Sequence, residues 1–348
     1  MTAPTASVRL NNDLPVGRFA ELAAAAEDAG FDQVWVSHDL FWRSAPVLVA
    51  AAAAVTRRIG LGIGILNPYS SHPAELAMHA ATLQELTGGR LLLGLGAGAA
   101  EFLGWAGIER PAPLARTRAA VTACRALLGG DGGRGVPEGW APEARLRWDG
   151  PPPPIYLGAM GPKMLALAGE VADGALGLSL PAERAVAAAA AVRAGAEAAG
   201  RDPRTVDVPA CFWCSVDDDA ERAAGPLAEK LAYYGPSLSP AMLAGTGLGP
   251  ADFLPAADAL HRGDPVEARR LVDARMLRLG IAGDPAAVTA RVGALQDAGF
   301  THLSFGPPLG PDPVQAVARL GRHVLPALRA GAAAARAGGA ARDGRGQR

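Results

Sequence analysis

Short apolar runs of strand type recur along the chain, and longer alanine-rich stretches with a helical period separate them. The pattern predicts strands at residues 7–10, 33–37, 60–66, 91–95, 155–158, 174–178, 206–216 and 302–305. It predicts helices at residues 16–29, about 46–56, 73–86, 114–128, 162–171, 182–199, 285–298 and 312–330. Regular alternation of strands and helices is typical of parallel βαβ units.

The predicted strands are almost continuously apolar, as in GLGIGIL at residues 60–66, which is typical of strands buried on both faces. Eight such units close naturally into a (β/α)8 TIM barrel, with an open doubly wound sheet as the alternative. A mostly helical insertion is predicted over about residues 219–284, between strands 7 and 8. We therefore expect one α/β barrel domain over residues 1–330 and a disordered tail over residues 331–348, where no apolar face occurs.

Composition narrows the classes of function. The chain has 348 residues, of which 50% are hydrophobic and 19% charged, so disorder fits the bulk of it poorly. The formal net charge of −1 provides no general attraction to nucleic acid or to an anionic membrane. No apolar run approaches the roughly 20 residues of a membrane-spanning helix. With three cysteines and no disulfide framework, the sequence predicts a cytoplasmic protein that acts on a small molecule.

In a TIM barrel the active site lies where strands end and helices begin. His38 and Asp39 stand at this position after the second predicted strand. Histidine exchanges protons near neutral pH, so the pair is a candidate for proton transfer. The alternative is a histidine that only hydrogen-bonds to a neighbouring loop.

A glycine-rich loop follows the fifth predicted strand and opens a helix. Its residues are Gly158, Ala159, Met160, Gly161, Pro162 and Lys163. Such a loop directs backbone N–H groups and a helix N-terminus at an anion, which favours a phosphate site. An ordinary tight turn is the alternative, and the loop is neither a dinucleotide fingerprint nor a Walker loop.

Glycines are also dense inside the third and fourth predicted strands, where they permit either a flat ring system or tight barrel packing. Cys211 and Cys214 form a CxxC, but a second cysteine pair and a nearby histidine are missing. The segment has strand character. We therefore predict neither a metal site nor a redox pair there.

Three segments, which begin at Asn11, Gly64 and Pro153, resemble the luciferase-like oxidoreductases. They read NNDLP, GILNPYSSHPAELAMHAATLQELTGGRLLLGLGAG and PPIYLGAMGPKMLALAGEVADGALGL. They are most similar to the branch of methylenetetrahydromethanopterin reductases that use coenzyme F420. The similarity covers roughly residues 7–330 and implies the same barrel fold.

The resemblance also implies a non-covalent flavin or deazaflavin ring over the strand ends, with its phosphate on the 158–163 loop. A non-proline cis peptide is implied at Gly64-Ile65, under the ring. Asn67 is implied to face the cofactor. Gly96 and Gly98 are implied to line the same pocket.

Two positions depart from the family pattern. Relatives often carry Asp-His where this chain has His38-Asp39, and the reductases carry a glutamate in the first strand where this chain has Arg9. Glu101, after the fourth strand, is a candidate for the missing carboxylate. These departures put the substrate of the reductases in doubt for this chain.

The resemblance predicts an oxidoreductase that moves a hydride between coenzyme F420 and a small organic substrate such as a methylene-tetrahydropterin or folate. The alternative on the same scaffold is an FMN-dependent monooxygenase or reductase, and a third reading is a non-catalytic flavin-binding protein. A homodimer is also implied.

Overall fold

The computed structural model describes residues 4–129, 135–177 and 184–331. Three predictions fall partly or wholly outside these ranges: the end of the sixth strand at Leu178, the start of the helix at Ala182, and the tail after residue 331.

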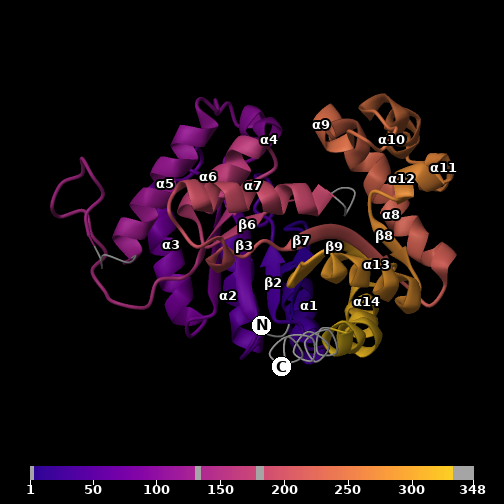
Figure 1. The fold of residues 1–348 in the computed structure, drawn as a ribbon, viewed down its shortest axis with the longest axis horizontal. Coiled ribbons are helices and arrows are strands. Elements are labelled where there is room, and N and C mark those ends of the chain that lie inside the picture. Colours follow the sequence, from indigo (N-terminus) through magenta and orange to yellow (C-terminus); the bar gives the residue numbers. More distant parts are fainter. Residues whose placement is uncertain (1–3, 130–134, 178–183, 332–348) are drawn as a thin grey trace, which may run out of the picture.

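Nine parallel strands in the described residues form one curled sheet (Figure 1). They are β1 (Thr5–Leu10), β2 (Gln33–Val36), β3 (Gly60–Leu66), β4 (Leu91–Leu95), β5 (Ile155–Gly158), β6 (Gly174–Leu176), β7 (Ala210–Val216), β8 (Ile281–Gly283) and β9 (His302–Leu309). Their order is β6-β5-β4-β3-β2-β1-β9-β7-β8. In the central ladder Ser7 of β1 pairs with Gln33 of β2, and Thr5 pairs with His302 of β9. This parallel α/β arrangement agrees with the predicted fold class.

Helices connect the strands and pack around the sheet. Those that follow β1 to β6 are α1 (Val16–Asp28), α2 (Ala45–Val55), α3 (Pro73–Leu86), α4 (Ala100–Trp105), α5 (Pro113–Leu128), α6 (Pro162–Val171) and α7 (Arg184–Ala198). Those that follow β7 to β9 are α8 (Ala220–Tyr234), α9 (Pro240–Leu243), α10 (Leu254–His261), α11 (Pro265–Leu271), α12 (Ala274–Leu277), α13 (Pro285–Asp297) and α14 (Pro313–Arg319). None of the helices in the described ranges carries an apolar stretch long enough to cross a lipid bilayer.

The strand β8 corrects the prediction of eight strands. Residues 281–283 were expected to belong to the helical insertion, but they pair with the last three residues of β7. A run of three residues is too short to show a strand period, so only the partner strand identifies it. The start of β7 is also later than predicted, at Ala210.

Asp207, just before β7, joins that part of the chain to β6. Its carbonyl accepts the Ala175 N–H at 2.9 Å, and its own N–H donates to the Asp173 carbonyl at 2.9 Å. The sheet therefore curls far enough for its β6 edge to meet the segment that leads into β7.

The helices between β7 and β8 have an apolar core of their own. Leu227 and Leu231 of α8 pack there with Phe253 and with Trp213 of β7, apart from the main core of the sheet. In Figure 1 these helices, in orange, form one group beside the sheet. Trp213 belongs to both the sheet and this cluster, so it fixes the helical group against the strand ends.

Candidate active site

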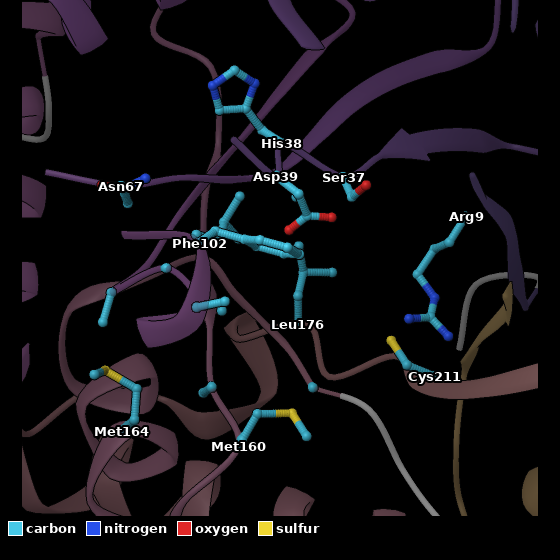
Figure 2. A pocket seen from close by; sticks show the side chains of 18 of the residues that line it. Arg9, Ser37, His38, Asp39, Asn67, Phe102, Met160, Met164, Leu176 and Cys211 are labelled. Carbon is cyan, nitrogen blue, oxygen red and sulfur yellow. The ribbon is translucent and has the colours of Figure 1, made fainter. Parts of the chain in front are cut away.

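A cavity of about 980 Å³ opens at the carboxyl ends of the strands (Figure 2). Residues from β1, β2, β3, β5, β6 and β7 line it, together with residues from α4 and α8. Its position follows from the parallel sheet, because all carboxyl ends point to one edge. The volume is in the range of cavities that hold cofactors and small ligands.

Most of the predicted site residues line this cavity. They are His38, Asp39, Gly64, Ile65, Asn67, Gly98, Gly158, Ala159, Met160, Gly161, Pro162 and Lys163. Glu101 and Gly96 do not line it. The Glu101 side chain is exposed on α4, although its charge acts on Tyr234 at the cavity wall.

The peptide bond between Gly64 and Ile65 is cis, as the resemblance implied. The pairing of β3 with β4 shifts its register here, between Ile63 and Leu66. The Ile65 side chain lies over Gly96, which directly follows β4, and over Gly158 at the end of β5. A Cβ at Gly96 would lie 3.1 Å from it, and one at Gly158 would lie 3.0 Å from it.

The strand glycines thus serve packing more than ligand approach. A Cβ at Gly94 would meet the Ile63 carbonyl oxygen at 2.1 Å, and a Cβ at Gly62 would meet the Trp35 ring at 2.3 Å. Gly96 is explained in the same way, because Ile65 fills the space beside it. Of the two readings left open by the sequence, tight packing accounts for these positions, while Gly64 and Gly98 do line the cavity.

Asn67 is buried, and its side-chain oxygen organises the loop after β3. Asn67 Oδ1 accepts hydrogen bonds from the N–H groups of Tyr69 at 3.0 Å and Ser70 at 2.9 Å. Gly98, with φ of 70°, packs against this amide. The Oδ1 atom is thus committed to the loop, and the rest of the amide lies at the cavity wall.

The loop after β5 has the features of an anion site. Helix α6 begins at Pro162, and its N-cap Gly161 provides no side chain to satisfy the first N–H groups of the helix. Lys163 is exposed at the cavity rim on the first turn. An uncapped helix N-terminus beside a lysine is a favourable position for a phosphate.

His38 and Asp39 line the same cavity but point in different directions (Figure 2). His38 Nδ1 accepts the N–H of Ala45, the first residue of α2, at 3.1 Å. The acceptor role requires Nδ1 to be unprotonated, so the neutral ring carries its proton on Nε2. Burial, and then the charge of His79, lowers the pKa of His38.

Asp39 belongs to a group of charges on the other side of the strand ends. Burial raises the pKa of the Asp39 carboxyl, while Ser37 and Lys230 oppose this rise. Burial lowers the pKa of Lys230 to about 8, with Asp13 and Asp39 opposing and Arg9 adding to the decrease. Shifted acids and bases around one cavity are typical of functional sites.

The family model for luciferase-like monooxygenases matches residues 1–302. The chain belongs to this luciferase-like family. The resemblance seen in the three sequence segments is therefore confirmed, and the family accounts for a cavity at the strand ends.

Individual relatives support the more specific branch. The 5,10-methylenetetrahydromethanopterin reductase of Methanolobus tindarius is 35% identical over 318 residues, covering 89% of this chain and 96% of the relative. The F420-dependent glucose-6-phosphate dehydrogenase of Nakamurella multipartita is 32% identical over 333 residues, covering 89% and 92%. The solved coenzyme F420 dependent tetrahydromethanopterin reductase from Methanopyrus kandleri matches with a TM-score of 0.81 and 29% identity, covering 93% of this chain and 99% of that chain.

Sequence reasoning missed several residues of this luciferase-like cavity. Phe102, Trp213, Lys230, Tyr234 and Met242 all line it, so the helical segment after β7 reaches the cavity wall. The only sequence signal was the aromatic stretch around Tyr234. The sequence around Lys230 gives no indication that this lysine lies at a cavity. Its position follows only from the packing of α8 against Trp213.

The CxxC of this luciferase-like chain lies within β7, as predicted from its strand character. Cys211 lines the cavity, whereas Cys214 is fully buried and has a pKa raised to about 12 by burial. Residues three apart on a strand face opposite sides, so the two thiols do not form a pair. Within the described ranges, no group of three or more His, Cys, Asp or Glu side chains could hold a metal ion.

Proposed function

We propose that this protein is an oxidoreductase that moves a hydride between coenzyme F420 and a small organic substrate. The observation that carries the proposal is the cavity at the strand ends, which Gly64 and Gly98 line, with the uncapped N-terminus of α6 at its rim. Relatives named as F420-dependent enzymes support the choice of cofactor, and this chain covers more than nine-tenths of each of them.

The cavity residues fit a flat, phosphate-bearing cofactor. Gly64 and Gly98 line it without side chains, so a planar ring can approach the backbone of these two segments. The phosphate would lie at the first turn of α6, where Lys163 adds a positive charge. When bound, coenzyme F420 supplies or accepts a hydride.

The remaining groups would control protons and orientation. His38, with its proton on Nε2, would donate a hydrogen bond to the substrate, and Asn67 would hold the ring edge. Asp39, whose pKa is raised, is suited to exchange a proton at a pH closer to neutral than a usual carboxyl. A methylene-tetrahydropterin or folate-like compound is one candidate substrate, although Arg9 in β1 points to a different one.

Titration of the purified apoprotein tests the cofactor. We expect coenzyme F420 to quench its fluorescence with a Kd in the micromolar range or below, and FMN to bind more weakly. Tighter binding of FMN, with oxygen consumption during turnover, would instead favour the monooxygenase alternative. Binding of both without turnover of any donor would favour a flavin-binding protein.

A charge substitution tests the phosphate position. Lys163→Gln removes the only lysine at the α6 N-terminus and should weaken F420 binding about tenfold, since charged hydrogen bonds contribute about 1.5–3 kcal/mol. Arg193→Gln is the matched control, because it removes an exposed charge from α7 outside the cavity. Equal F420 affinity of the two variants would show that the phosphate lies elsewhere.

We also propose that the curled sheet is a (β/α)8 barrel over residues 1–330, with the helices after β7 as an insertion over its mouth. The bridge between Gly174 and Asp207 supports closure between β6 and β7. A homodimer is proposed from the family resemblance, and light scattering during size-exclusion chromatography would measure the mass in solution.

A further inference from the structure

Arg9 extends from β1 into the cavity. Its Nη2 donates to the Phe212 carbonyl at 3.1 Å, and Gly306 leaves the space that the guanidinium needs, because a Cβ there would lie 2.5 Å from Nη2. The buried Nε–H has no hydrogen-bond partner among the described residues. Three strands therefore fix this guanidinium, yet its charge is incompletely compensated.

Lys230 brings a second cation to the same cavity. Its ammonium lies 4.3 Å from the Tyr234 ring centroid and 5.7 Å from that of Trp213. Within the described part of the chain, neither Lys230 nor Arg9 has a carboxylate within the 4.0 Å of an ion pair. Burial is the main cause of the lowered pKa of Lys230, and the positive charge of Arg9 contributes in the same direction.

The nearby carboxyls compensate these cations only in part. Asp13 is exposed to solvent, so water screens its charge. Burial raises the pKa of Asp39, which favours its neutral form. An anion placed between Arg9 and Lys230 would therefore stabilise both cations.

This cationic end is separate from the proposed phosphate position. In Figure 2, Arg9 and Cys211 lie on one side of the cavity, whereas Asn67 and Met164 lie on the other. Apolar and aromatic side chains, among them Phe102 and Trp213, also line the cavity. A ligand at the Arg9 end would thus combine a negative charge with an apolar body.

We propose that Arg9 and Lys230 bind the anionic group, a carboxylate or a phosphate, of a substrate whose apolar body lies against Phe102 and Trp213. The inference rests on the proposed function, because it takes the other end of the cavity to hold the cofactor. It narrows the small organic substrate of the proposed function to organic anions with an apolar body.

Calorimetric titration of the F420-loaded protein with benzoate, phenyl phosphate and the neutral benzamide tests this site. We expect benzoate or phenyl phosphate to bind about tenfold more tightly than benzamide. The anion that binds more tightly shows whether the site prefers a carboxylate or a phosphate. Arg9→Gln and Lys230→Gln should each weaken anion binding about tenfold and leave benzamide binding and F420 binding within about twofold.

Controls separate the charge effect from damage to the fold. Arg193→Gln should leave anion binding unchanged, and Arg9→Lys should retain part of it. If Arg9→Gln is misfolded by circular dichroism, Lys230→Gln decides. Equal affinities for benzoate and benzamide, or variants that bind anions as tightly as the parent protein, would overturn the inference.

The two proposals can fail separately. If F420 does not bind but anion binding to the apoprotein depends on Arg9 and Lys230, the cofactor assignment is wrong and the anion site stands. If F420 binds and the anions show no preference over benzamide, the anion site is wrong and the cofactor assignment stands.

Discussion

One nitrogen of the His38 ring both determines the protonation state of the ring and accepts a hydrogen bond from the start of a helix. The N-cap of α2, Ser44, makes no side-chain hydrogen bond, and His38 Nδ1 accepts the first N–H of that helix instead. A protonated ring would lose this bond and would bring a positive charge to the positive end of the helix. The helix and burial therefore both favour the neutral ring.

This arrangement predicts how activity depends on pH. The pKa of His38 lies below its usual 6.5, so the neutral ring persists through neutral pH and is lost as the pH falls through the lowered pKa. The contribution of His38 to stability decreases in the same direction, because the unfolded chain takes up the proton first. We expect kcat/KM to fall at acidic pH with an inflection below 6.5.

A pH–rate profile of two variants checks the assignment. His38→Ala should lower the rate about 10²–10⁴-fold and remove the acidic inflection. His79→Gln, which removes a positive neighbour, should move the inflection slightly toward higher pH. An unchanged acidic limb in His38→Ala would assign that limb to another group.

At the scale of elements, the glycines of β3 and β4 allow close packing, because atoms of neighbouring segments occupy the space of the missing side chains. The Ile63 carbonyl occupies the position of a side chain at Gly94, and the Ile65 side chain lies beside Gly96 and Gly158. The register shift in β3 depends on this space. The sequence shows that Gly94 is a glycine. It does not show that the Ile63 carbonyl of the neighbouring strand occupies the space beside it.

Gly94→Ala should therefore destabilise the protein and weaken cofactor binding. Its Cβ would lie 2.1 Å from a backbone oxygen, which cannot rotate away, so β3 must shift, at a cost of about 1–3 kcal/mol. Gly293→Ala in α13 is the control, since no atom lies within 4 Å of the added Cβ. That change should stabilise the helix by about 0.5–1 kcal/mol.

Urea unfolding and F420 titration of both variants give the answer. If Gly94→Ala has the same free energy of unfolding and the same F420 affinity as the parent protein, the strand adjusts to the added Cβ without cost. A loss of affinity in Gly293→Ala would instead point to an effect of glycine substitution in general.

At the scale of the whole molecule, a polar network joins distant strands at the end opposite the cavity. His302 of β9 contacts Asp207 through Nδ1 at 2.7 Å and Ser7 of β1 through Nε2 at 2.8 Å, and the Tyr156 hydroxyl of β5 donates to Asp207 at 2.8 Å. Burial alone would raise the pKa of Asp207, but His302 and Tyr156 hold it below its usual value. The network links segments on both sides of the junction at Gly174.

Asp207→Ala should lower the free energy of unfolding by about 1–3 kcal/mol for each partner left unsatisfied. Because the pKa of Asp207 is below 3.8, its contribution is complete above that pH and is lost as the pH falls through the lowered value. The difference from the parent protein should thus be constant near neutral pH and shrink in acid. Urea unfolding at several pH values measures it.

Asp258→Ala is the matched control, because Asp258 is exposed on α10 and the change should cost less than about 0.5 kcal/mol. Cofactor affinity should be unchanged in Asp207→Ala below its unfolding transition, since the network lies away from the cavity. Stability equal to that of the control would show that the network contributes nothing.

The sequence by itself determined the alternation of strands and helices, the edge at which the cavity lies, and a set of site residues of which most line that cavity. These features are local, since an apolar run, a helix start or a glycine-rich turn is decided by neighbours in the chain. The short strand β8 and the helix α4 were not predicted, because such short segments are determined by contacts with distant parts of the chain.

Only the tertiary structure decided how the charges are arranged. Arg9 and Lys230 are 221 positions apart in the numbering, and nothing in either segment indicates that they share a cavity. The separate directions of His38 and Asp39, and the exposure of Glu101, also depend on how the strands and α4 pack. Burial and Coulomb interactions depend on distances in space, and the fold sets those distances across the whole chain.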